Sequence, residues 1–186
     1  PKLTTPTYEL EIPSTDEKIK FRPFLVKEEK ILMMAMESKK SADIVQAVKD
    51  IVNECTFNKI NISDMPMFDV EYIFLQIRSK SVGEVSELRI LCPDDGKTYG
   101  NVSLDLNDVK VQVGDDHTNK IELGNGTGMI MKYPTIDSFR ESGIQDINAS
   151  NMLEVIGTCI LQIYEEEGKK VYDPKDQTKK EVSEFI

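Results

Sequence analysis

Residues 7–30 read TYELEIPSTDEKIKFRPFLVKEEK, and this stretch decides how the chain begins to fold. Its first six residues alternate between polar and apolar, which indicates a half-buried strand. The turn cluster Pro-Ser-Thr-Asp follows, and residues 18–21 then alternate again. The sequence therefore predicts a β-hairpin, whose pairing ends at Pro23 because proline has no amide donor. The residues expected to point inward are Tyr8, Leu10, Ile12, Ile19 and Phe21.

Three helices are predicted after the hairpin, over residues 26–37, 42–55 and 65–80. Apolar residues recur there at spacings of three and four, which is typical of helices with a buried stripe. Ser41 and Asp64 stand where the N-caps of the second and third helices are expected. The third helix is apolar nearly all round, so we expect it to be enclosed. The predicted core face of the first helix consists of Ile31, Leu32, Ala35 and Met36.

Beyond Val82 the apolar pattern changes to alternation, which favours strands. The predicted strands cover residues 87–92, 98–104, 109–113, 120–123 and 128–133. Helices are predicted again over residues 135–140, over residues 149–164 and from residue 178. The expected fold class is α+β, in three parts. These are an N-terminal hairpin with a helical core (1–82), an inserted small antiparallel β module (83–133) and C-terminal helices that complete the core (134–186).

Charge and composition narrow the classes of partner. The chain has 186 residues and a net charge of −10, so phosphate backbones and anionic membranes repel it. A basic protein partner, or none, is a better expectation, and no small-molecule substrate is indicated. Three cysteines at wide spacing indicate free thiols in a reducing compartment. The eight methionines suit either a partner-binding surface or core filling, and core filling is favoured for most of them.

The run Cys92-Pro93-Asp94-Asp95-Gly96 has the form of a zinc-ribbon knuckle, with Asp95 in the position of the second thiolate. No second knuckle follows, and one thiolate with one or two carboxylates is a poor zinc site. The sequence therefore predicts a degenerate, zinc-ribbon-like hairpin turn without metal.

No complete catalytic set is present, so we expect neither enzymatic activity nor a cofactor. His117 is the single histidine, and no nucleophile elbow accompanies it. Residues 124–128 read GNGTG but lack the Gly-Lys-Ser/Thr end of a phosphate loop, so a hairpin turn is expected. A small hydrolase that uses clustered carboxylates, such as Asp95, Asp115 and Asp116, is a distant alternative.

The best candidate for an interaction site is the turn Phe21-Arg22-Pro23-Phe24 together with Lys27. An arginine between aromatic residues resembles the composition of interface hot spots. In the alternative interpretation the two phenylalanines close the core and Arg22 pairs with Glu28 or with the next glutamate. The alternative is favoured for the aromatic residues.

Several stretches resemble a family of phage proteins, the baseplate hub subunits or hub-assembly proteins of T-even-like contractile-tailed bacteriophages. The stretches are PTYELEIPS (6–14), IKFRPFLVKEEK (19–30), FDVEYIFL (68–75), RSKSVGE (78–84) and HTNKI (117–121). The resemblance implies a late, non-enzymatic protein that acts through contacts with other hub or spike proteins. It also implies a location in the host cytoplasm during assembly, and in the tail baseplate if the protein stays in the virion.

The resemblance leaves two roles open, a structural hub component or a transient assembly chaperone. Many relatives carry paired cysteines in the β module, whereas this chain has only Cys92 there, so no metal is carried over from the family. Relatives also extend past the last predicted helix, which implies a short or truncated member.

Overall fold

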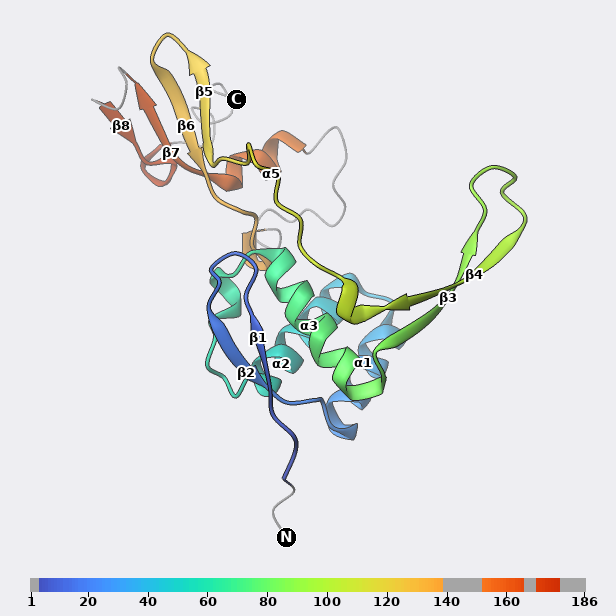
Figure 1. Ribbon diagram of the computed structural model, residues 1–186. Coiled ribbons are helices and arrows are strands. Elements are labelled where there is room, and N and C mark those ends of the chain that lie inside the picture. Colours follow the sequence, from blue (N-terminus) through green and yellow to red (C-terminus); the bar gives the residue numbers. More distant parts are fainter. Residues whose placement is uncertain (1–3, 139–151, 166–169, 178–186) are drawn as a thin grey trace. The chain divides into compact units, whose positions relative to one another are not determined.

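The computed structural model describes residues 4–138, 152–165 and 170–177 (Figure 1). It contains helices and small antiparallel sheets, as the predicted α+β class requires. The chain forms two compact units. The first unit comprises residues 1–62 and 68–112, and the second comprises residues 63–67 and 113–186.

The N-terminal hairpin is confirmed. Strand β1 (Tyr8–Glu11) pairs antiparallel with β2 (Lys18–Phe21), and Tyr8 lies opposite Phe21 with their ring centroids 5.6 Å apart. Ile12, Ile19 and Phe21 are buried, so the alternating pattern does place one face of the hairpin inward.

Three helices follow, close to their predicted bounds: α1 (Val26–Ser38), α2 (Ser41–Cys55) and α3 (Met67–Val82). Helix α1 ends at Ser38, its C-cap Lys39 has a left-handed φ of 56°, and α2 packs against α1. The buried core residues of α2 and α3 are Ala47, Ile51, Val52, Cys55, Val70, Ile73 and Ile77.

Both predicted N-caps are corrected. Ser41 is the first residue of α2, and the cap position belongs to Lys40. Asp64 ends a short 3-10 helix, η1 (Ile62–Asp64), and α3 begins three residues later, directly after Pro66. In both cases the observed start of the helix differs from the predicted start by one or a few residues, because sequence patterns locate helix ends less well than helix interiors.

The orientation of α1 differs from the prediction. Ala35 is buried and Leu32 is half-buried, but Ile31 and Met36 are exposed. The helix instead buries Glu28, which lies on the same side as Ala35. The contacts of Glu28 in the first turn therefore determine which face of α1 is buried.

A two-stranded ribbon completes the first unit. Strand β3 (Val85–Leu91) pairs with β4 (Tyr99–Asp105), and the 3-10 helix η2 (Leu106–Asp108) follows with Leu106 buried. The predicted strand over 109–113 is wrong, since these residues have no strand pairing in the structure. Their alternation has no neighbouring strand edge to bind.

The second unit contains an antiparallel sheet in the order β5-β6-β7-β8. The strands are β5 (Lys120–Gly124), β6 (Thr127–Met131), β7 (Ile160–Glu165) and β8 (Lys170–Tyr172), and the 3-10 helix η4 (Pro174–Asp176) follows. A small core forms around Met129, Ile160 and Ile163, with Met131 and Tyr172 packed against it.

The helix predicted over 149–164 is partly wrong. Helix α5 (Met152–Cys159) ends where β7 begins, and β7 pairs with β6. A register shift lies in this pairing, so Ile160 pairs with Met131 and Ile163 with Met129. The bulge puts residues three apart on one face and thereby imitates helical spacing.

The two compact units do not coincide with the three predicted parts. Residues 83–133 are divided between the units, because β3 and β4 pair with each other whereas β6 pairs with β7. A helix begins at residues 136–138, inside the predicted range 135–140. The helix predicted from residue 178 lies outside the described residues.

Candidate functional site

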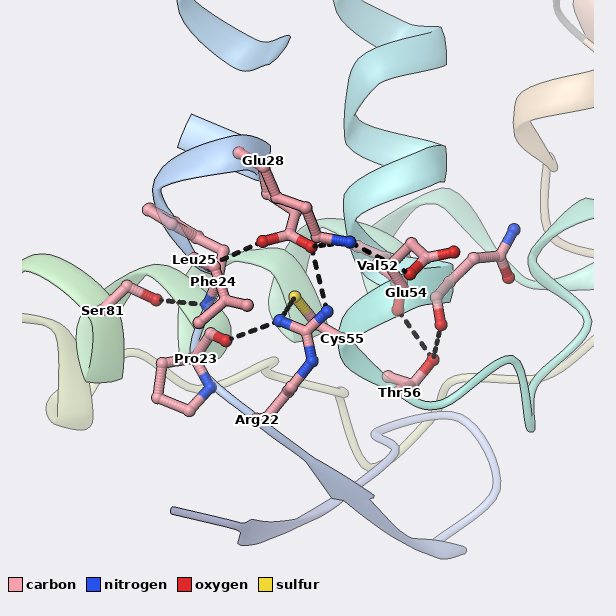
Figure 2. Close-up of polar contacts among 12 residues, drawn as sticks. Arg22, Pro23, Phe24, Leu25, Glu28, Val52, Glu54, Cys55, Thr56 and Ser81 are labelled. Atoms are coloured by element: carbon pink, nitrogen blue, oxygen red, sulfur yellow. Dashed lines mark hydrogen bonds and ion pairs between the residues drawn. The ribbon is translucent and has the colours of Figure 1, made fainter. Parts of the chain in front are cut away.

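The predicted interaction turn lies where four elements of the first unit meet (Figure 2). The backbone amide of Arg22 donates to the carbonyl oxygen of Cys55 at 2.9 Å, which joins the end of β2 to the end of α2. The amide of Phe24 donates to Ser81 Oγ on α3 at 3.0 Å. The turn itself leads into α1, so these bonds fix the positions of all four elements.

The guanidinium group of Arg22 is buried and makes three contacts. Nη2 donates to Glu28 Oε1 at 3.0 Å, and Nη1 donates to the Pro23 carbonyl oxygen at 3.0 Å. Nη1 also lies 3.7 Å from Cys55 Sγ, a weak acceptor. Figure 2 shows the guanidinium with its contacts to the Glu28 carboxylate, the Pro23 carbonyl and the Cys55 thiol.

Glu28 is 2% exposed, and it binds both Arg22 and the backbone at the start of α1. Its Oε2 accepts the amide of Leu25 at 2.6 Å, so this glutamate in the first helical turn satisfies a backbone donor that precedes the helix. Lys27 Nζ lies 3.2 Å from Glu28 Oε1 and 3.7 Å from Glu54 Oε2. The buried carboxylate thus has partners on both oxygens.

These contacts set the ionisation of the cluster. Burial alone would raise the pKa of Glu28, but the hydrogen bonds from Arg22, Leu25 and Lys27 outweigh it, and the net pKa is lowered. Burial opposes the charge on Arg22, yet its contact with Glu28 leaves the pKa of Arg22 raised. Burial raises the pKa of Cys55 to about 11. Near neutral pH the cluster is an ion pair beside a protonated thiol, which makes Cys55 a poor nucleophile.

The predicted interaction residues therefore have different surroundings. Phe21 is fully buried in the core, and Arg22 pairs with Glu28, as the alternative interpretation expected. Phe24 is half-buried, and Lys27 is the one of the four that is exposed. The arrangement stabilises the first unit, and Lys27 is its most exposed side chain among the four.

A second buried polar contact was not predicted. Asp69 on α3 is completely buried, and its carboxylate accepts hydrogen bonds from the amide and the hydroxyl of Ser14. Burial raises the pKa of Asp69, although both bonds from Ser14 act in the opposite direction. The sequence has no local signal for this contact, because α3 also carries Glu71 and Ser14 lies 55 residues before Asp69.

The knuckle-like run forms the tip of the β3–β4 ribbon. The amide of Cys92 donates to the Thr98 carbonyl oxygen at 2.7 Å, and Gly96 has a left-handed φ of 62°. Asp95 accepts hydrogen bonds from the hydroxyl of Thr98 and from the amides of Thr98 and Lys97, and these bonds lower its pKa to about 2. Within the described residues no cluster of His, Cys, Asp and Glu could hold a metal ion.

The sequence reasoning missed an exposed methionine surface on α1. Met33, Met34 and Met36 are 58%, 60% and 60% exposed, although core filling was the favoured interpretation for most methionines. Val26 and Ile31 on the same helix are exposed as well. The signal was present in the run Ile-Leu-Met-Met-Ala-Met, which is more apolar than one buried stripe requires.

A protein-family model described as T4 bacteriophage base plate protein matches residues 5–186. The chain belongs to this family. The match includes all the contacts of the Arg22 cluster and the exposed surface of α1. Comparisons with curated proteins and with solved structures gave no match.

The baseplate protein thus has a buried ion pair in its first unit and exposed methionines on α1. In the part of the chain that the structure describes, no helix has both the length and the apolar content needed to cross a membrane.

Proposed function

We propose that this baseplate protein is a non-enzymatic assembly component of the central hub, which acts through contacts with other hub or spike proteins. The exposed methionine surface of α1 is the observation that carries the proposal. It consists of Met33, Met34 and Met36, and it is defined here as the α1 methionine surface. Methionine side chains are flexible and polarisable, so such a surface adapts to the shape of a partner.

The contacts of the first helical turn support this proposal. Glu28 and Ala35 hold one face of α1 against the rest of the unit, and this leaves the methionines on the exposed side. Exposed apolar groups that gather on one helix are typical of interaction sites. The net charge of −10 favours a partner with a basic surface around its apolar contact.

A transient assembly chaperone, absent from the mature virion, is the second candidate role. The same two observations favour it, because a flexible methionine surface on a strongly acidic protein suits reversible binding. A permanent hub subunit would bury the α1 methionine surface in the finished baseplate, whereas a chaperone would expose it again after release.

The test replaces Met33, Met34 and Met36 together by serine in the full chain. We expect at least about a fivefold loss of co-purified hub proteins and of infectious particles, because the apolar contact area is removed. Met152→Ser is the matched control, since Met152 is 49% exposed on α5 in the second unit. Wild-type assembly by a triple variant that has normal helical circular dichroism would contradict the proposal.

A further inference from the structure

The β3–β4 ribbon exposes nearly all of its side chains. Every residue of β4 is exposed, and so is every residue of β3 except Ser86. The sheet has two strands, which Figure 1 shows as a long ribbon. A two-stranded hairpin is at best marginally stable in water, so a ribbon of this kind gains stability when a third strand or a covering element binds to it.

The two faces of the ribbon differ in character. Residues paired across the strands share a face, and Leu88 lies opposite Val102. This face is apolar, and its side chains are 39–48% exposed: Leu88, Ile90, Val102 and Leu104. The other face is polar in its middle, with Glu87 opposite Ser103 and Arg89 opposite Asn101, and it has Val85, Leu91 and Tyr99 at its ends. The middle of the ribbon is therefore amphipathic, and its apolar face is open to solvent among the described residues.

The hydrogen bonds at the two ends of the ribbon show which backbone groups point outward. At one end the Leu106 amide donates to the Glu84 carbonyl at 2.7 Å, and at the other the Cys92 amide donates to the Thr98 carbonyl at 2.7 Å. In an antiparallel pair, hydrogen-bonded residue pairs alternate with pairs whose backbone groups point outward. Because the bonded pairs at both ends consist of even-numbered residues, the even-numbered residues of both strands bond to each other. The backbone groups of Tyr99, Asn101 and Ser103 consequently point away from β3.

The two edges of the ribbon are protected to different degrees. The β3 edge carries Glu87 and Arg89, and charged residues of this kind normally block edge-to-edge pairing. Residues 99–104 of β4 read YGNVSL and contain neither a charge nor a proline, and the one charged residue of the strand, Asp105, is its last. The β4 edge is therefore the one open to strand addition.

Charge indicates the kind of strand that would bind there. Residues 84–108 contain six acidic and two basic side chains, in a chain whose net charge is −10. A second copy would bring the same negative charge to the edge, whereas a segment with flanking Lys or Arg would be attracted. Apolar residues at alternate positions of that segment would extend the apolar face of the ribbon.

We propose that the β4 edge accepts a β-strand from a basic, alternately apolar segment of another baseplate protein. This inference rests on the proposed function, because it takes the partner from the same assembly. It assigns to the ribbon an interaction separate from that of the α1 methionine surface.

The test uses the full chain and synthetic twelve-residue peptides that cover the sequences of the other baseplate proteins of the same phage. Binding is measured by fluorescence polarisation, and amide hydrogen exchange is then measured with the tightest peptide bound. We expect the binding peptide to be basic and alternating, and its binding to weaken as salt is added. We also expect at least about tenfold slower exchange at the amides of Tyr99, Asn101 and Ser103.

Two variants at one position make the test specific. Asn101→Pro removes an outward amide and is tolerated at a strand edge, so peptide affinity should fall by at least about tenfold. Asn101→Ala keeps the amide and should bind within about twofold of wild type. Equal binding by the proline variant, or the absence of protection at β4, would overturn the inference.

Two other outcomes separate this inference from the proposed function. A dimer that is abolished by Asn101→Pro would show that a second copy occupies the edge, and this too would overturn the inference. If no peptide binds while the chain still co-purifies with hub intermediates, the β4 edge is not the docking site and the proposed function stands. If the chain is missing from hub intermediates but β4 is protected by peptide, the proposed function fails instead.

Discussion

Replacement of Arg22 by methionine tests how the first unit is held together. The substitution retains an apolar side chain of similar length but removes the guanidinium that donates to Glu28 Oε1 at 3.0 Å. The Glu28 carboxylate stays 2% exposed and keeps the Leu25 amide and Lys27 as partners. A buried charge is thus left with incomplete compensation.

The expected loss follows from these contacts. Removal of one partner of a buried ion pair typically costs about 3–5 kcal/mol of unfolding free energy. Lys27 is 61% exposed and still lies 3.2 Å from the carboxylate, so the lower end, about 3 kcal/mol, is expected. Lys20→Met is the control, because Lys20 and Glu9 are both 64% exposed at 3.6 Å, and such surface pairs contribute about 0–1 kcal/mol.

The double variant Arg22→Met with Glu28→Met separates the ion pair from its surroundings. It removes both charges and leaves mainly the Leu25 amide without its acceptor, so a loss of about 1–2 kcal/mol is expected. The double variant should therefore be more stable than Arg22→Met alone, and the cycle should give a coupling energy of at least about 1.5 kcal/mol.

The assay is urea unfolding followed by circular dichroism at 222 nm, where α1, α2 and α3 dominate the signal of the first unit. Glu28 has a lowered folded pKa, so its stabilisation is present above the unfolded value of about 4.3 and is lost as the pH falls through the folded value. The difference between wild type and Arg22→Met should shrink over that range. A loss below about 1 kcal/mol for Arg22→Met at pH 7, or a double variant less stable than the single, would refute the reasoning.

Further predictions concern single residues in both units. Burial raises the pKa of Asp69, so ionisation of this carboxyl destabilises the folded state at pH 7. Asp69→Asn should therefore make the unfolding free energy less dependent on pH. The stability of wild type relative to this variant should increase as the pH falls toward about 3.9, the pKa of an unfolded aspartate. Gly128→Ala should cost about 1–3 kcal/mol, because a Cβ there would overlap a tyrosine of β7, whereas Gly100→Ala has open space and should change stability by less than about 0.5 kcal/mol in thermal unfolding. Maleimide at pH 8 should modify native Cys55 at least about a hundredfold more slowly than Cys92, given its burial and a pKa of about 11, and equal rates would contradict this.

Local patterns predicted the elements whose neighbours lie close in sequence. The hairpin over residues 8–21 and helices α1 to α3 follow from alternation, from three- and four-residue spacing and from turn residues. The pairing of Arg22 with Glu28 could also be predicted from the sequence, since the two residues are six apart and flank one turn.

Long-range contacts account for what the sequence could not predict. Strand β7 was expected to be helical because a bulge opposite β6 puts Ile160 and Ile163 on one face. The contact between Ser14 and Asp69 joins residues 55 apart and has no local pattern. Which face of α1 is exposed depends on the burial of Glu28. That burial depends on the position of Arg22, which directly follows β2.

The most direct test of the proposed hub function is quantitative mass spectrometry of isolated hub intermediates beside purified mature phage particles. We expect the chain in hub intermediates at a fixed small copy number. Its presence in mature particles at the same number would identify a structural subunit, and its absence from them would identify an assembly chaperone. Absence from both samples would contradict the proposed function.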